Sequence, residues 1–312
     1  MKLFHTDLFV LPLPVGHRFP MQRYRLLRER LEQSGLFADE ELSVPPAATD
    51  DQLRLVHTED WVRRVSSGDL TRDELRRIGF PWSQQMAERS RRSTGATITA
   101  ARCALEDRVA ANLAGGTHHA FADRGAGYCV FNDVAVAVRT LQRETRIEQA
   151  LIIDADVHQG DGTAAIFSND PQVRTFSLHA KKAFPARKQQ SDLDIELPPG
   201  STDEEYLAKL TQGLDWASVQ PPPDIVFYLA GADPFELDTL GGLAVTKRGL
   251  RQRDLLVFQF CVDHALPLVI TLAGGYAPDI RDIVDIQFHT IVLAKQMLSE
   301  CVSGAGRGET IF

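Results

Sequence analysis

Short apolar runs alternate with amphipathic segments along most of the chain. Apolar residues recur at helical spacing between Pro20 and Leu31, and again after Thr202, where a Thr-x-x-Glu capping box opens the segment. The apolar runs are continuous, which is typical of strands buried on both faces of a sheet. The pattern predicts an α/β fold with a parallel central sheet and helices on both of its faces.

The boundaries of these elements follow from the same pattern. We expect buried strands at 150–154, 173–178, 225–230 and 268–272, and helices at 132–142, 162–167, 246–262 and 279–299. The longest helical stretch spans 83–113 and ends before two glycines. The apolar run at 8–14 is broken by prolines and predicts an edge strand, not a signal peptide. We find no repeat or linker and expect a single domain over 1–312.

Composition excludes several classes of protein. The 312 residues are 44% hydrophobic and 24% charged, which is ordinary globular composition. A net charge of −8 argues against direct nucleic-acid binding, and no apolar run approaches the roughly 20 residues that span a bilayer. No Cys-x-x-Cys pair is present, which favours unpaired thiols and a cytoplasmic location. The four cysteines are Cys103, Cys129, Cys261 and Cys301.

Each predicted strand runs directly into polar or glycine-rich sequence. Ligands of open parallel sheets bind beyond the carboxyl ends of the strands, so we expect these segments to converge on one site. The segments are Asp154-Ala155-Asp156-Val157-His158, Ser177-Leu178-His179, Gly231-Ala232-Asp233 and Gly274-Gly275-Tyr276.

The chemistry of these segments is complementary. Asp156, His158 and Asp233 can bind one metal ion that keeps an open position. His119 can act as a base and Tyr276 as a donor to a developing oxyanion. Taken singly, each residue has a simpler interpretation as a helix cap, a packing residue or a surface residue. Their combination indicates a metal-dependent hydrolase.

Five motifs appear in an order that resembles the zinc-dependent histone deacetylase family, in particular bacterial members close to the class IV deacetylases. They lie at 115–120, 127–133, 154–162, 231–233 and 274–276, with a further match at 17–21. The resemblance covers residues from about 15 to about 300. It implies the arginase/deacetylase fold with about eight parallel strands, and the removal of acetyl or longer acyl groups from lysine side chains.

The resemblance also implies roles for individual residues. Zinc would bind Asp156, His158 and Asp233. His119 would be the general base and then the acid for the leaving amine, and Tyr276 would donate to the scissile carbonyl. His118 would be the second histidine and would act through its charge. Asp154 would hold His118, and Asp161 would hold His119.

Further expectations concern the surroundings of the metal. The walls of the acyl-lysine channel would be Tyr128 and Phe184, and the carbonyl of Gly127 would accept the substrate amide proton. Arg23 would line a cavity for the acetate product. A structural potassium ion would bind near Asp154, Asp156, His158, Ser177 and Leu178.

The chain departs from the family pattern at several positions. Gln159 stands where a histidine often follows the zinc-binding histidine, and Tyr128 replaces the usual channel phenylalanine. No acidic rim residue is found near 79–82, so peptide specificity stays open. Gly160 and Gly231 stand where the related binuclear manganese arginases carry additional carboxylates, and we therefore reject a binuclear guanidine hydrolase.

Several alternatives stay open at this point. The expected substrate is an acylated lysine in a peptide or protein, or another acylated amine. A deacetylase of acetylpolyamines or other small molecules is the second hypothesis, and a non-catalytic scaffold that binds acyl-lysine is the third. The hard ligand set also accepts Fe²⁺, Co²⁺ or Mn²⁺. The preferred acyl length, the oligomeric state and the relevance of histones do not follow from the sequence.

Overall fold

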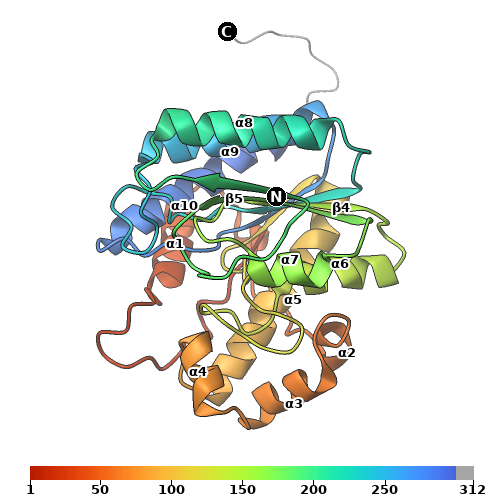
Figure 1. Cartoon of the computed structure of the whole chain (residues 1–312), viewed down its shortest axis with the longest axis vertical. Coiled ribbons are helices and arrows are strands. Elements are labelled where there is room, and N and C mark those ends of the chain that lie inside the picture. Colours follow the sequence, from red (N-terminus) through yellow and green to blue (C-terminus); the bar gives the residue numbers. More distant parts are fainter. Residues whose placement is uncertain (300–312) are drawn as a thin grey trace.

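A parallel sheet of eight strands forms the centre of the computed structural model, which describes residues 1–299 (Figure 1). The strand order is β2-β1-β3-β8-β7-β4-β5-β6, and every neighbouring pair is parallel. This confirms the predicted fold class. The strands are β1 (Lys2–Phe4), β2 (Leu42–Ser43), β3 (Val109–Asn112), β4 (Ala150–Asp154), β5 (Val173–Ala180), β6 (Leu193–Leu197), β7 (Ile225–Leu229) and β8 (Leu268–Thr271).

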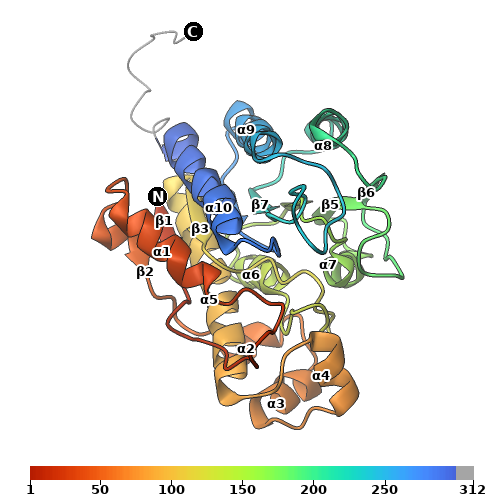
Figure 2. The same cartoon turned by 90° about the vertical axis from the view of Figure 1, so that its left-hand side faces the viewer.

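Helices cover both faces of the sheet, as Figure 2 shows. One layer contains α1 (Arg23–Gln33), α8 (Asp203–Ser218), α9 (Lys247–Asp263) and α10 (Ile280–Ala294), in which α8 packs on α9, α9 on α10 and α10 on α1. The other layer contains α5 (Gln84–Asp107), α6 (Asp133–Arg143) and α7 (Asp161–Phe167). A π-helical turn at Lys295–Ser299 continues α10.

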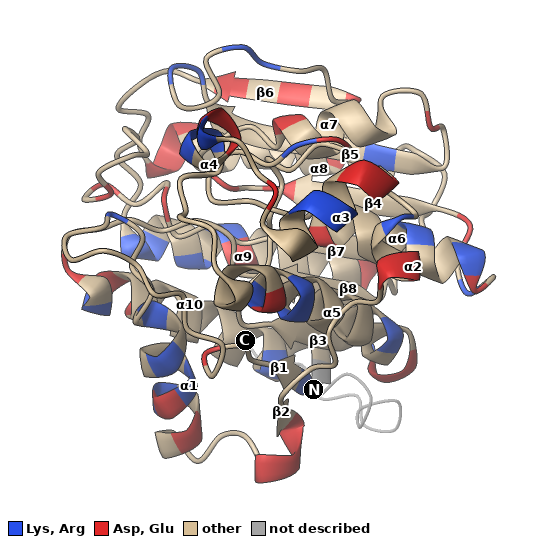
Figure 3. Ribbon diagram, turned by 90° about the horizontal axis from the view of Figure 1, so that it is seen from below, with Lys and Arg blue, Asp and Glu red and all other residues tan. Residues whose placement is uncertain are grey.

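Short helices lie outside the second layer. They are α2 (Asp50–Leu53), α3 (Glu59–Ser67) and α4 (Arg72–Ile78), and a 3₁₀ turn at Asp39–Glu41 precedes β2. Figure 3 shows acidic and basic residues interspersed on this side. Arg64 and Glu74, for example, form an ion pair at 2.7 Å. Within residues 1–299, none of the helices combines the length and the apolarity that crossing a membrane requires.

Successive strand residues contribute alternately to two hydrophobic cores. Leu151 and Ile153 pack into the core beneath α8 and α9, whereas Ile152 packs into the core beneath α5 and α6. Side chains of a strand alternate between the two faces, so a strand buried on both sides must be apolar throughout. The continuous apolar runs in the sequence have this cause.

The end of one predicted helix and the position of one predicted strand are wrong. The helix expected over 83–113 ends at Asp107, where Arg108 takes a left-handed φ of 71° and the chain continues as strand β3. Pairing of β3 with β1 and β8 overrides the local helical preference of its alanines. The first strand is Lys2–Phe4, and the proline-interrupted run at 8–14 belongs to no strand because proline cannot donate to a ladder.

The thiols of Cys103, Cys129 and Cys261 are unpaired, as predicted. The prediction for Cys301 lies outside the described residues, as does the end of the domain expected over 1–312.

His57 forms hydrogen bonds to the loop between β3 and α6. This loop contains the histidine pair of the sequence motif. The backbone N–H of Asn132 donates to Nε2 of His57 at 2.9 Å. The Nδ1 atom must therefore carry the proton, and it donates to the carbonyl of Phe121 at 3.0 Å. Burial lowers the pKa of His57 to about 4, against the effect of its backbone hydrogen bonds, so the ring is neutral in the folded protein near pH 7.

The neutral state of His57 makes folding stability dependent on pH. Below its ordinary pKa of about 6.5, the unfolded chain binds a proton that the folded protein does not take up until about pH 4. The lowered pKa of His57 leaves the free energy of unfolding undiminished above pH 6.5 and reduces it by about 3 kcal/mol as the pH falls to 4. Urea unfolding of the wild type and His57→Gln should show a stability difference that narrows as the pH falls. A difference that does not change with pH would contradict this role.

Candidate active site

The polar segments identified in the sequence meet at the carboxyl end of the sheet. His118 and His119 follow β3, Asp156 and His158 follow β4, and Asp233 follows β7. Tyr276 follows β8, which lies between β3 and β7 in the sheet. The predicted convergence is therefore present in the fold.

Asp156, His158 and Asp233 form a buried cluster whose ligand atoms lie within 4.8 Å of one another. The Nδ1 atom of His158 lies 2.9 Å from Oδ1 of Asp156 and 3.3 Å from Oδ2 of Asp233. This Oδ2 atom is buried and has no hydrogen-bond partner. A buried acceptor without a donor is costly, and a bound cation would satisfy it.

The backbone orients the two carboxylates of this cluster. The N–H of Gly274 donates to Oδ2 of Asp156 at 2.8 Å, and the N–H of Val157 donates to Oδ1 of Asp233 at 3.0 Å. Burial and the negative charge of Asp156 raise the pKa of Asp233 to about 7. The cluster thus concentrates negative charge away from water, and its donor set fits one divalent metal ion.

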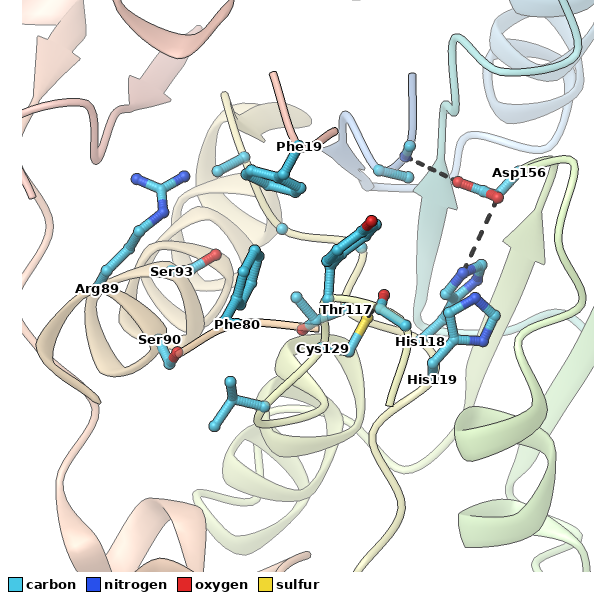
Figure 4. A pocket seen from close by; sticks show the side chains of 18 of the residues that line it. Phe19, Phe80, Arg89, Ser90, Ser93, Thr117, His118, His119, Cys129 and Asp156 are labelled. Carbon is cyan, nitrogen blue, oxygen red and sulfur yellow. Dashed lines mark hydrogen bonds and ion pairs between the residues drawn. The ribbon is translucent and has the colours of Figure 1, made fainter. Parts of the chain in front are cut away.

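The two histidines are held by separate carboxylates. Nδ1 of His118 lies 2.7 Å from Oδ2 of Asp154, and Nδ1 of His119 lies 2.7 Å from Oδ1 of Asp161. The two rings are 4.1 Å apart between centroids, and Figure 4 shows them beside Asp156. These contacts leave Nε2 of each ring available to the site, and Nε2 of His118 lies 3.9 Å from Oδ1 of Asp156.

The environments of the two rings differ in charge. Burial opposes a charge on His118, but the carboxylates of Asp154 and Asp156 raise its pKa to about 9. Burial and the positive charge of His118 lower the pKa of His119 to about 4. Neighbouring groups with separated pKa values can divide the tasks of an acid and a base.

Gly127, Tyr128 and Phe184, which the sequence places in a channel, lie beside the histidine pair. The ring of Phe184 packs edge-to-face on His119 with 4.8 Å between centroids, and Phe184 is 45% exposed. A Cβ on Gly127 would lie 2.6 Å from Cδ2 of His119, so only glycine fits there. The ring of Tyr128 lies 5.8 Å from that of Tyr276. The two aromatic rings therefore lie next to His119 and Tyr276.

A cavity of about 70 Å³ extends from the histidine pair into the protein. Figure 4 shows Phe80 between His118 and the polar far end, which is formed by Arg89, Ser90 and Ser93. Arg23 also lines this cavity, and its Nη2 donates to the carbonyl of Ala273 at 2.7 Å.

Two further predicted positions lie near the cluster. Asp154 and Ser177, which were expected at a potassium site, are register partners in strands β4 and β5, and the next residue, Leu178, is fully buried.

Gln159 stands at a position where the chain departs from the family pattern. Its amide donates to the carbonyl of Gln189 at 2.7 Å and to Asp194 at 2.8 Å. Gln159 therefore holds the segment that follows Phe184.

The sequence did not identify two carboxylates that orient the site. Asp133 accepts hydrogen bonds from the N–H groups of Gly116 and Thr117 at 3.1 and 2.8 Å, just before the histidine pair. Asp238 accepts from the N–H of Tyr276 at 2.5 Å. Asp133 is fully buried. Its place within the motif at 127–133 was a signal that the sequence offered, whereas no sequence motif contains Asp238.

Comparisons with known proteins agree with this geometry. A family model described as the histone deacetylase domain matches residues 17–289. The chain is 45% identical over 282 residues to an uncharacterised protein of Picosynechococcus sp., covering 90% of this chain and 94% of that protein. It is 31% identical over 269 residues to histone deacetylase 2 of Arabidopsis thaliana, covering 83% and 70% respectively.

Solved structures show the same fold. A histone deacetylase homologue complexed with SAHA superposes with a TM-score of 0.83 at 27% identity, covering 95% of this chain and 83% of that one. A homologue from Aquifex aeolicus gives a TM-score of 0.81 at 26% identity, covering 96% and 83%. Because the family model spans most of the chain, the chain belongs to the histone deacetylase family, whose chemistry is the hydrolysis of amide bonds.

Proposed function

We propose that this protein hydrolyses the side-chain amide of N-acetyl-lysine or a longer N-acyl-lysine with one divalent metal ion on Asp156, His158 and Asp233. The convergence of their three ligand atoms within 4.8 Å, beside the histidine pair, carries the proposal. Zinc suits this set of two carboxylates and one imidazole, and Fe²⁺, Co²⁺ or Mn²⁺ would also fit it.

Such an ion, when bound, supplies Lewis acidity at the scissile carbonyl and lowers the pKa of water. Asp161 holds Nδ1 of His119, so Nε2 of this ring takes a proton from the attacking water and later returns it to the leaving amine. His118 stays beside Asp156, where its charge stabilises negative charge that develops in the site.

Tyr276 completes the proposed machinery. Its ring lies 6.2 Å from that of His158 between centroids, at the border of the cluster. Burial raises the pKa of Tyr276 well above its usual value, so the hydroxyl keeps its proton and can donate to the developing oxyanion.

The surroundings of the cluster suit a slim acylated amine. Tyr128 and Phe184 would supply aromatic walls for the alkyl part of a lysine, and the carbonyl of Gly127 would accept a hydrogen bond from its amide N–H. Ser177 and Leu178, next to Asp154, would contribute to a structural potassium site. Arg23 would bind the released carboxylate within the cavity.

A panel of substrates separates the functional hypotheses. The metal-loaded protein should hydrolyse acetyl-lysine and longer acyl-lysine peptides faster than acetylpolyamines, because the sequence carries no long insertion that would narrow the entrance. Release of free amine measures each rate. Faster turnover of acetylpolyamines would assign the protein to small-molecule substrates. Metal binding without turnover of any member would contradict an enzymatic function and favour a scaffold.

Tyr276→Phe removes the proposed oxyanion donor and little else. We expect kcat to fall about 10²- to 10³-fold, the usual cost of losing one such donor. Metal content, measured on the same sample, should equal that of the wild type. Tyr128→Phe is the matched control because it removes a hydroxyl from the neighbouring ring and should change kcat only a few-fold. A kcat of Tyr276→Phe that is undiminished, or no lower than that of Tyr128→Phe, would remove Tyr276 from the mechanism.

A further inference from the structure

A buried ion pair that the proposed mechanism does not use lies behind the metal-binding loops. Arg253 and Asp254 are consecutive on α9, and they are 0% and 2% exposed. Nε of Arg253 donates to Oδ1 of Asp254 at 3.0 Å. The hydroxyls of Tyr228 and Thr290 each donate to Asp254 at 2.6 Å. Residues of β7 and α10 thus hold the carboxylate, and the carboxylate holds the guanidinium.

The free end of this guanidinium reaches the loop that carries Asp233. Nη1 of Arg253 donates to the carbonyl of Gly231, two residues before that carboxylate. The loop is crowded here, because a Cβ on Gly231 would lie 2.7 Å from Oδ1 of Asp233 and 2.9 Å from Oδ2 of Asp156. A shift of the Gly231 backbone would therefore change the separation of the two carboxylates.

A second side chain from the same layer of helices reaches the other metal-binding loop. Tyr206 on α8 is fully buried, and its hydroxyl donates to the carbonyl of Ala155 at 3.3 Å. Ala155 directly precedes Asp156. Helices α8 and α9 thus hold the backbone of both loops from one face of the sheet.

The contribution of the Arg253–Asp254 ion pair to stability does not by itself explain its presence in the core. A buried ion pair is often no more stabilising than apolar side chains of similar volume, because both charges lose their hydration. The guanidinium offers donors in a fixed planar fork, which can bind Asp254 and the Gly231 carbonyl at the same time. An apolar or single-donor side chain cannot do so.

We propose that Arg253 is a positioning residue of the metal centre. It fixes the carbonyl of Gly231 and thereby sets the distance of Asp233 from Asp156 and His158. This inference rests on the metal centre proposed above. Arg253 touches neither the metal nor the substrate, and it acts through the backbone of the Asp233 loop.

Arg253→Lys tests the inference because it keeps a positive charge beside Asp254 and loses the fork. We expect the Kd for Co²⁺ to weaken about 10- to 100-fold, as for other groups that orient metal ligands. The visible absorption of the Co²⁺ protein should shift, because the spectrum reports ligand geometry. Leu250→Ala, a buried change on the same helix, is the control and should lower stability while leaving both readouts unchanged.

The outcomes distinguish the inference from the proposed function. A wild-type protein that binds no Co²⁺ would contradict the metal centre itself. Wild-type binding together with an unchanged Kd and spectrum in Arg253→Lys would overturn the positioning role alone. Should Arg253→Lys fail to fold, Thr290→Val removes one hydroxyl that orients Asp254 and should cause a smaller spectral shift in the same direction. An unchanged spectrum in that variant would equally overturn the inference.

Discussion

Two buried carboxylates, Asp156 and Asp233, are held close together at the carboxyl end of a parallel sheet. Their ligand atoms and that of His158 lie within 4.8 Å, and one carboxylate oxygen has no donor. Negative charges in such a place repel each other and lack water, and a bound cation would offset this cost. The glycines around them permit this approach: a Cβ on Gly274 would lie 1.9 Å from Oδ2 of Asp233.

The remaining parts of the site follow from where the strands end. Strands β4, β7, β8 and β3 are consecutive neighbours in the sheet, although they are far apart in the sequence. Their final residues are followed by the proposed metal ligands, the tyrosine and the histidine pair, and each group takes its orientation from hydrogen bonds to carboxylates or backbone. Asp156 lies beside His118, and the charge of His118 lies beside His119, so the two adjacent imidazoles have different surroundings, which allows one ring to carry charge while the other stays neutral.

The sequence predicted that the segments after β4, β7 and β8 would meet, because these segments stand immediately after continuous apolar runs. It did not predict the partners that orient them, since these depend on contacts between distant segments. Asp238 binds the N–H of Tyr276 across 38 residues, and Arg253 reaches Gly231 from a helix that looks ordinary in the sequence. Strand β3 was not predicted for a related reason: its pairing with two neighbouring strands outweighs an alanine-rich composition that favours a helix.

X-ray absorption at the edge of the bound metal tests the central claim most directly. We expect one divalent ion per chain, with only nitrogen and oxygen ligands at about 2.0–2.2 Å and scattering from a single imidazole. Asp233→Asn should lower the affinity for this ion. A protein that binds no metal after loading, or one whose metal has sulfur ligands or several imidazoles, would rule out a metal centre on Asp156, His158 and Asp233.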